Sequence, residues 1–276
     1  MTEITVAAPA RRTADGTGPY YQPVGNEVEV FTAAFRSRRA IMLTGPTGCG
    51  KTRFVEAMAH QLGVPLHTVS CHEDLSSSDL LGRYLLKAGE TVWVDGPLTR
   101  AARHGGICYL DEIVEARQDA TVVVHSVADH RRELNLERHG AERIVAHSDF
   151  CLVVSFNPGY QSVLKDLKVS TRQRMVTVRF GFPPAEAEHE VVVRETGVGP
   201  DEAWALVLFA QAVRRLEHGR LREAASTRTV VAAAALTSQG MSTFDAGMAA
   251  MVRPMTDDAD EEAGLAAMLE TYTARR

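Results

Sequence analysis

The stretch GPTGCGKT occupies residues 45–52, and the apolar run AIML at 40–43 leads into it. It has the pattern G-x-x-x-x-G-K-T, placed between an expected strand and an expected helix. Glycines let backbone N–H groups curl around the phosphates of a nucleotide, Lys51 reaches the β- and γ-phosphate oxygens, and the Thr52 hydroxyl holds Mg²⁺. The stretch therefore predicts a nucleoside triphosphate site. The expected phosphate-contacting residues are Gly45, Pro46, Thr47, Gly48, Cys49, Gly50, Lys51 and Thr52.

A helix is expected directly after this loop. Phe54, Met58 and Leu62 recur every four residues, as on one face of a helix. The N-terminus of such a helix points its dipole and its free N–H groups at the phosphates.

The second half of the site is expected about 60 residues later, where the apolar run ICYL at 107–110 is followed by Asp111 and Glu112. A buried parallel strand that ends in two carboxylates places them at the edge of the sheet where ligands of open α/β folds bind. Asp111 would hold Mg²⁺ as the acidic partner of Thr52, and Glu112 would polarise the attacking water. A solvated strand end gives the same pattern, but together with the loop the pair predicts an ATP or GTP hydrolase.

Three polar residues after the next strand are further candidates. The expected strand Cys151–Ser155 runs into Asn157, which is an ordinary turn residue unless this strand lies between those carrying the loop and the carboxylates. In that case its amide can orient the water or touch the γ-phosphate. Arg172 and Arg174 precede the last core strand. An arginine at this place can simply cap surface charge, or in an oligomer it can enter the nucleotide site of a neighbouring subunit and neutralise charge on the transferred phosphate.

The whole chain predicts an α/β core followed by a helical domain. Strand-like and helix-like segments alternate up to about Phe182, which argues for a parallel sheet between helices, and beyond Pro183-Pro184 only helical patterning remains. We expect a flexible tail at 1–20, a nucleotide-binding core at 21–183 and a helical lid domain at 184–276. The expected core strands are Ala40–Leu43, Leu66–Ser70, Ile107–Leu110, Phe150–Ser155 and Met175–Phe180. The expected lid helices are about 185–196, 201–217, 227–238, 244–251 and 260–273.

Two inserted segments interrupt the core. Tyr84–Lys87 and Thr91–Val94 are strand-like around Ala88-Gly89-Glu90, which predicts a hairpin after a helix that begins near Ser77. Arg131–Glu137 forms either a second hairpin or an ordered loop. Trp93, in the first hairpin, is either a local packing residue or a contact for a partner.

Composition narrows the classes further. The chain has 276 residues with a net charge of −5, which gives no general basic footprint for nucleic acid. The four cysteines form no C-x-x-C pair and are expected to be small buried or near-site thiols. No cluster typical of a metal site other than Mg²⁺ occurs, and no run of about 18 apolar residues is present. These features favour a cytoplasmic protein.

The order of the motifs resembles that of AAA+ ATPases of the MoxR type. In chain order they are GPTGCGKT (45–52), ICYLDE (107–112), SFNPGYQ (155–161), STRQRM (170–175) and ASTRT (225–229). Within that type the chain looks like the subgroup called CbbQ, NirQ or NorQ, and the stretches VEARQDATVVVHSVADHRREL (114–134) and VVSFNPGYQSVLKDLKVSTRQRM (153–175) carry this similarity. The resemblance runs from about Tyr20 to the C-terminus.

The resemblance implies a role for each motif residue. Lys51 and Thr52 match the Walker A pair, Asp111 and Glu112 the Walker B pair, Asn157 sensor 1 and Arg228 the sensor 2 arginine. It leaves the arginine finger open between Arg174 and Arg172. The hairpin at 84–94 resembles an insert found in the second helix of this clade.

The resemblance also implies an assembly and partners. Members form a ring, usually a hexamer, with ATP between subunits, and they work with a von Willebrand factor A domain protein to remodel or activate a metabolic enzyme. Subgroup relatives act on Rubisco or on nitric oxide reductase.

Three other functions remain open. A P-loop small-molecule kinase would show acceptor-dependent turnover as a monomer. A DNA-associated AAA+ ATPase would be expected to carry a helix-turn-helix or a basic appendage, whereas residues 257–262 of this chain are strongly acidic. A scaffold that hydrolyses little ATP is disfavoured by the intact Glu112.

Overall fold

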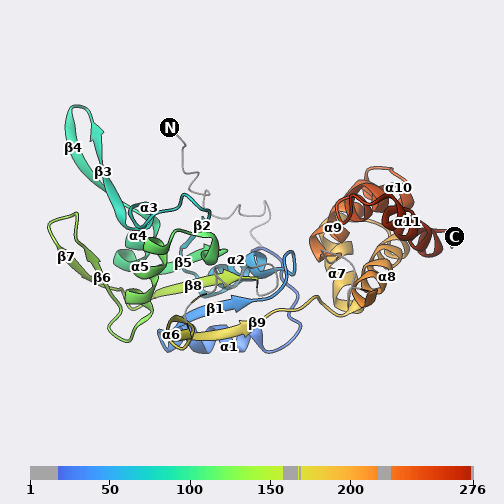
Figure 1. Ribbon diagram of the computed structural model, residues 1–276. Coiled ribbons are helices and arrows are strands. Elements are labelled where there is room, and N and C mark those ends of the chain that lie inside the picture. Colours follow the sequence, from blue (N-terminus) through green and yellow to red (C-terminus); the bar gives the residue numbers. More distant parts are fainter. Residues whose placement is uncertain (1–17, 158–166, 168, 217–224, 275–276) are drawn as a thin grey trace. The chain divides into compact units, whose positions relative to one another are not determined.

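The computed structural model describes residues 18–157, 167, 169–216 and 225–274 of the chain, so most of the expected tail lies outside the described residues. The chain divides into two compact units after Phe180, with loop residues 46–50 grouped with the second unit (Figure 1). None of the described helices combines the length and the apolar character that a membrane crossing requires.

The first unit is built on a five-stranded sheet whose strands all pair in parallel. The order is β2-β5-β8-β1-β9. The strands are β1 (Ala40–Thr44), β2 (Leu66–Ser70), β5 (Gly106–Asp111), β8 (Phe150–Phe156) and β9 (Met175–Arg179). All five expected strands are confirmed. Because β8 lies between β1 and β5, the carboxyl ends of these three strands meet at one edge of the sheet.

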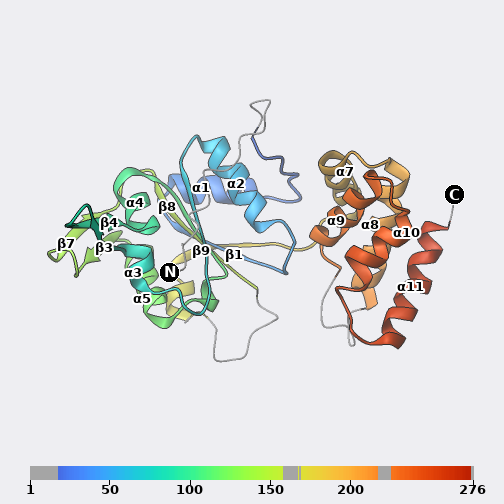
Figure 2. The ribbon, with the colours of Figure 1, turned by 90° about the horizontal axis from the view of Figure 1, so that it is seen from above.

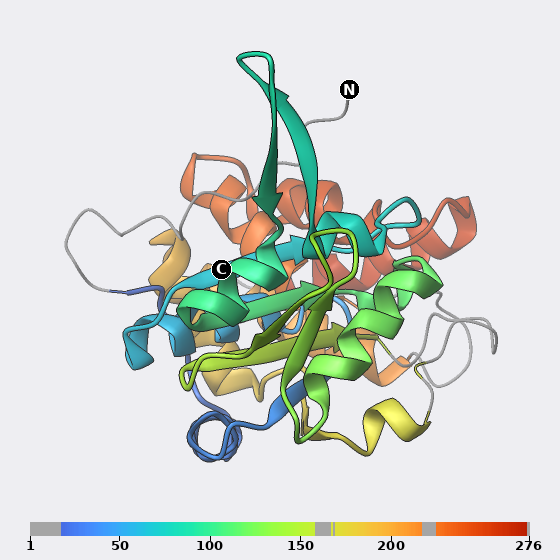
Figure 3. The ribbon, with the colours of Figure 1, turned by 90° about the vertical axis from the view of Figure 1, so that its left-hand side faces the viewer.

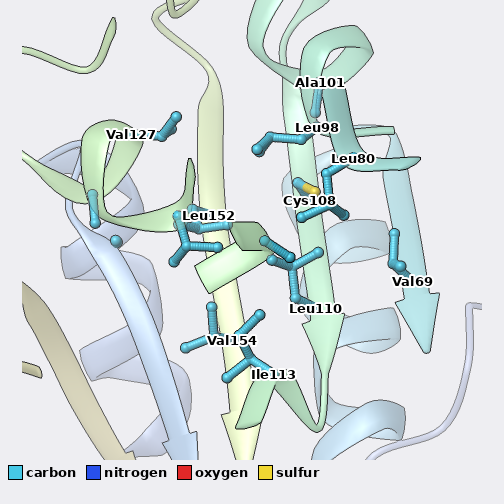
Figure 4. Packing of buried hydrophobic residues seen from close by; sticks show 14 of the residues in the cluster. Val69, Leu80, Leu98, Ala101, Cys108, Leu110, Ile113, Val127, Leu152 and Val154 are labelled. Atoms are coloured by element: carbon cyan, nitrogen blue, oxygen red, sulfur yellow. The ribbon is translucent and has the colours of Figure 1, made fainter. Parts of the chain in front are cut away.

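Alternate side chains of each strand face opposite sides of the sheet. On one side, Phe54 and Met58 of α2 (Lys51–Leu62) pack with α1 (Glu27–Arg36). On the other side lie α3 (Ser77–Leu81), α4 (Pro97–His104) and α5 (Gln118–Ala128), as Figure 4 shows for Leu80 and Leu98 over the sheet. Burial of one such side chain contributes about 1.5–3 kcal/mol. The helices packed on both faces of the sheet therefore hold in place the edge where the carboxyl ends of β1, β8 and β5 meet.

Two antiparallel hairpins extend from the same end of the core (Figures 1 and 2). The first joins β3 (Gly82–Lys87) to β4 (Glu90–Asp95), as expected, and stands out from the core in Figure 3. The second joins β6 (Glu133–Leu136) to β7 (Glu142–Val145). The expectation of a hairpin within Arg131–Glu137 is wrong in extent, because that segment supplies one strand only and pairs with a strand beyond the turn at 137–141.

Aromatic and ionic contacts join the two hairpins. The Trp93 ring stacks on the His139 ring with centroids 4.7 Å apart, and the Tyr84 hydroxyl lies 3.1 Å from His139 Nδ1. From α4, Arg103 donates to Asp95 at 2.9 Å and to both carboxylate oxygens of Glu142. Trp93 is thus a packing residue between the hairpins.

Two short elements complete the first unit, a 3₁₀ turn at Ile113–Glu115 (η1) and α6 (Val169–Arg172).

The second unit is entirely helical in its described residues. Its elements are α7 (Ala185–Thr196), α8 (Pro200–Leu216), α9 (Thr227–Ser238), α10 (Thr243–Gly247), the π-helical η3 (Met248–Val252) and α11 (Ala259–Thr273). The expected helices agree with these bounds to within one residue, except that the expected helix 244–251 is split between α10 and η3 and that residue 217, the expected end of another helix, lies outside the described residues. Side-chain caps from Ser226, Ser242 and Asp258 begin three of the helices.

Candidate functional site

Glycines shape the loop between β1 and α2. Gly45, Gly48 and Gly50 have φ of 155°, 71° and 97°, a region that favours glycine over residues with a Cβ. The loop can therefore turn tightly and aim successive N–H groups inward. Lys51 is the first residue of α2 and is only 7% exposed. Its Nζ donates to the Gly45 carbonyl at 2.9 Å, which folds the side chain back toward the loop.

Asp111 ends β5 and accepts hydrogen bonds from three neighbours. Thr52 Oγ1 donates to Asp111 Oδ2 at 3.2 Å. The Tyr109 hydroxyl donates to Oδ1 at 2.7 Å, and the Ser155 hydroxyl donates to the same oxygen. These contacts fix the carboxylate beside the first turn of α2.

Glu112 adopts a backbone conformation that is uncommon for its type. Its φ of 57° and ψ of 48° lie in the left-handed region, which costs a non-glycine residue about 1 kcal/mol or more. The Glu112 N–H donates to Ser155 Oγ at 3.1 Å, so the next strand holds this turn in place. The conformation directs the side chain toward Asn157, whose Nδ2 donates to Glu112 Oε1 at 3.2 Å.

Asn157 connects the loop lysine to the carboxylate of Glu112. Its Oδ1 accepts a hydrogen bond of 2.6 Å from Lys51 Nζ, while its amide nitrogen donates to Glu112. This bridge follows from the sheet order, because β8 places Asn157 between the ends of β1 and β5. The condition stated for Asn157 from the sequence is therefore met.

The sequence does not single out two polar side chains of this network, Tyr109 and Ser155. Both are fully buried. Burial raises the pKa of the Tyr109 hydroxyl, and the charge of Asp111 raises it further, so Tyr109 stays protonated and can only donate to that carboxylate. The available signal was a polar residue inside each apolar strand run, ICYL and LVVSF.

All four cysteines are free and buried, as expected from their pattern. Cys71 lies beside Asp111, and its backbone N–H donates to the Asp111 carbonyl at 2.9 Å. Burial, together with the negative charges of Asp111 and Glu112, raises the pKa of the Cys71 thiol to about 12. A thiol that stays protonated is a poor nucleophile.

The residues present fit a Mg²⁺ ion that is bound together with a phosphate. Mg²⁺ prefers oxygen ligands, keeps several waters and usually takes only one or two groups from the protein. The Thr52 hydroxyl and the Asp111 carboxylate supply such a pair. In the described part of the chain, no group of three or more His, Cys, Asp or Glu side chains is arranged to hold a metal.

Arg174 lies at the opposite end of the sheet from the loop. It directly precedes β9, whose first residue, Met175, pairs with Ala40 at the start of β1. The loop follows Thr44 at the end of β1, so the strand separates Arg174 from the loop by about 13 Å.

Neither candidate arginine is brought to the loop of its own core. The Arg174 guanidinium donates to the Ser170 carbonyl at 2.5 Å and lies 3.1 Å from His125 Nε2. Arg172 ends α6. In the second unit, Arg228 is the second residue of α9 and is exposed.

Two protein families match adjoining parts of the chain. Residues 40–175 match the AAA domain (dynein-related subfamily), and residues 188–272 match the family described as CbbQ/NirQ/NorQ C-terminal.

Individual relatives are similar over most of the chain. Protein NorQ of Paracoccus denitrificans is 56% identical over 247 residues, which cover 90% of this chain and 91% of the relative. Denitrification regulatory protein NirQ of Pseudomonas aeruginosa is 52% identical over 93% of this chain and 98% of the relative. Protein CbbQ of Hydrogenophilus thermoluteolus is 51% identical over 93% of this chain and 96% of the relative.

Among solved structures, a RuvB mutant of Thermotoga maritima has a similar fold. The TM-score is 0.53 at 14% identity, over 93% of this chain and 72% of that one. At this identity the likeness concerns the fold alone.

Proposed function

This chain belongs to the CbbQ/NirQ/NorQ family of AAA ATPases, and on that premise we propose that it hydrolyses ATP with Mg²⁺ to remodel or activate a metabolic enzyme. Nucleotide binding follows from the AAA domain itself. The single observation that carries hydrolysis is the bridge from Lys51 through Asn157 to Glu112, which links a phosphate-binding cation to a candidate base.

Each residue of the network has a distinct task in the proposed reaction. Lys51 binds the β- and γ-phosphate oxygens, and Thr52 and Asp111 would hold Mg²⁺. The ion, when bound, supplies positive charge beside the phosphates. Glu112 accepts a proton from the attacking water, and Asn157 orients that carboxylate. Ser155 and Tyr109 keep the two acidic residues in place through the contacts described above.

A second copy of the chain completes the proposed site. Because β1 separates Arg174 from the loop of its own core, this arginine can serve a reaction only at the site of another subunit. That requirement supports a ring, for which six subunits is our proposal. Arg172 stays as the alternative finger.

The proposed client is a metabolic enzyme, and the proposed partner is a von Willebrand factor A domain protein. Support comes from the relatives, one of which is described as a denitrification regulatory protein. From the family resemblance described above for the sequence motifs, we propose nitric oxide reductase or Rubisco as candidate client classes.

Nucleotide binding and phosphate release test the proposal with two variants. Lys51→Ala should lose ATP binding, because the phosphate charge then meets no ammonium group. Glu112→Gln should bind ATP and yet release phosphate at least 100-fold more slowly, about the contribution of a general base. An unchanged rate for Glu112→Gln would overturn the assignment of the base. Turnover that depends on an added small-molecule acceptor would indicate a kinase instead.

A further inference from the structure

Glu188, in α7, is a fully buried carboxylate outside the nucleotide site. Arg214 donates to both of its oxygens, each at 2.7 Å. Gln211 Nε2 donates to Oε2 at 3.2 Å, and Thr227 Oγ1 donates to Oε1 at 2.6 Å. Four donors satisfy a charge that would otherwise be very costly to bury.

The same cluster holds the segment that enters the second unit. The Arg214 guanidinium lies over the Phe182 ring, 4.1 Å from its centroid. Gln211 Nε2 also donates to the Pro183 carbonyl at 3.0 Å. Both residues belong to α8, so the linker at 182–183 is attached to the body of the helical unit.

The cluster also fixes the start of α9. Arg214 Nε donates to the Ala225 carbonyl at 2.7 Å, and Thr227 is bonded to Glu188. Between them, Ser226 caps the helix by accepting from Thr229 N–H at 3.3 Å. Three consecutive anchored residues therefore come directly before the exposed Arg228.

The residues before the linker are anchored differently. Phe180 belongs to the first unit, where its N–H donates to the Thr44 carbonyl at 2.7 Å and its ring packs 5.2 Å from that of Phe54. Gly181 separates it from Phe182, and a Cβ at Gly181 would meet nothing within 4 Å. A pivot at Gly181 would thus lie between one aromatic anchor in each unit.

We propose that Glu188 and Arg214 are positioning residues for Arg228. Arg214 lies over Phe182 and donates to Ala225, while Glu188 accepts from Thr227 and from Gln211, which also donates to Pro183. These contacts make the linker and the start of α9 one rigid piece, so that Arg228 moves with the linker when the chain turns at Gly181. A buried ion pair is a poor way to gain stability alone, since apolar residues of similar volume often do as well. This ion pair has a different role, because the side chains around it contact both the linker at 182–183 and the segment 225–227 directly before Arg228. The inference rests on the proposed ATPase function and adds residues to it.

The first test needs no ATP. Glu188→Gln removes the charge at nearly constant volume and leaves Arg214 without a negatively charged partner, whereas Glu186→Gln, at an exposed position of the same helix, is the matched control. Hydrogen exchange in Glu188→Gln should speed up together at the Phe182 amide and at 225–230 and stay unchanged in α11, while Pro183 carries no exchangeable amide. Exchange that speeds up throughout the unit, or nowhere, would overturn the inference.

The second test is a double-mutant cycle on ATP turnover. Glu188→Gln should lower kcat about tenfold, and in an Arg228→Ala background it should lower kcat no further. Thr227→Val, which keeps the ion pair, should give a smaller loss that also disappears in that background, and it serves if Glu188→Gln folds poorly. Additive losses, or full activity of Arg228→Ala, would overturn the inference. A wild-type protein that hydrolyses no ATP would instead overturn the proposed function, and the hydrogen-exchange result alone would then test the Glu188–Arg214 cluster.

Discussion

At the scale of single residues, the Ser155 hydroxyl ties the two acidic residues of the site together. It accepts from the Glu112 N–H and donates to Asp111, and it is fully buried. The left-handed backbone of Glu112 is held by this hydroxyl at its N–H and by the Glu115 N–H, at 2.9 Å, at its carbonyl. Ser155 therefore helps to fix both the Asp111 carboxylate, which we propose holds Mg²⁺, and the backbone turn at Glu112, the proposed base.

Replacement of Ser155 should separate turnover from binding. Ser155→Ala removes both hydrogen bonds, a loss of about 1–1.5 kcal/mol that falls mainly on the reacting geometry, so we expect kcat to fall about tenfold. ATP affinity should change less than about threefold, since Lys51 and the loop are untouched. Steady-state kinetics and calorimetric binding measure the two effects.

The conservative variant supplies the control. Ser155→Thr keeps the hydroxyl and should recover most of the lost rate. Equal losses in Ser155→Thr and Ser155→Ala would mean that the site responds to packing rather than to the hydroxyl.

At the scale of elements, the two hairpins pack against each other, and the first hairpin has an apolar tip. The Trp93–His139 stack and the Arg103–Glu142 pair lie at the turn end of the second hairpin, away from the tip of the first. Toward the tip of the first hairpin, Leu86 is 77% exposed and Val92 is 41% exposed. Exposed apolar side chains on a projecting hairpin are typical of a surface that contacts another protein.

Replacement of residues 86–92 by a short Gly-Ser turn tests that role. The change leaves residues 45–52, which we expect to contact phosphate, and the Trp93–His139 stack in place, so ATP binding should persist. Activation of the client enzyme, in the presence of the von Willebrand-type partner, should be lost. The measurement is client activity recovered per ATP consumed, with a client identified by capture on Glu112→Gln in ATP.

A milder pair of changes controls for lost assembly. Leu86→Ser should impair activation, whereas Lys87→Ser, at the neighbouring exposed position, should not. A deletion variant that still assembles and rescues the client at an unchanged ATP cost would show that the hairpin only packs locally.

At the scale of the whole molecule, the sequence predicts features that depend on neighbouring residues better than it predicts contacts between residues far apart in the chain. The loop, the five strands and the lid helices depend on neighbouring residues, and the sequence was sufficient for them. β7 was missed because ERIV is short and one of its apolar residues, Val145, is exposed. The sequence did not reveal the cluster of Glu188, Arg214 and Thr227, because Arg214 and Thr227 lie 26 and 39 residues from Glu188 along the chain. Only the packing of α7, α8 and α9 brings them together.

The central claim is that ATP is hydrolysed between two copies of the chain. In the proposed reaction, Lys51 and Glu112 would act from one copy and Arg174 from its neighbour, where a finger contributes on the order of 10³-fold or more to the rate. The most direct measurement mixes two inactive variants, Lys51→Ala and Arg174→Ala, and follows phosphate release from verified mixed rings. Some interfaces of such rings pair an intact Lys51 with an intact Arg174, so activity should reappear. Mixed rings that stay as inactive as either variant alone would contradict the claim.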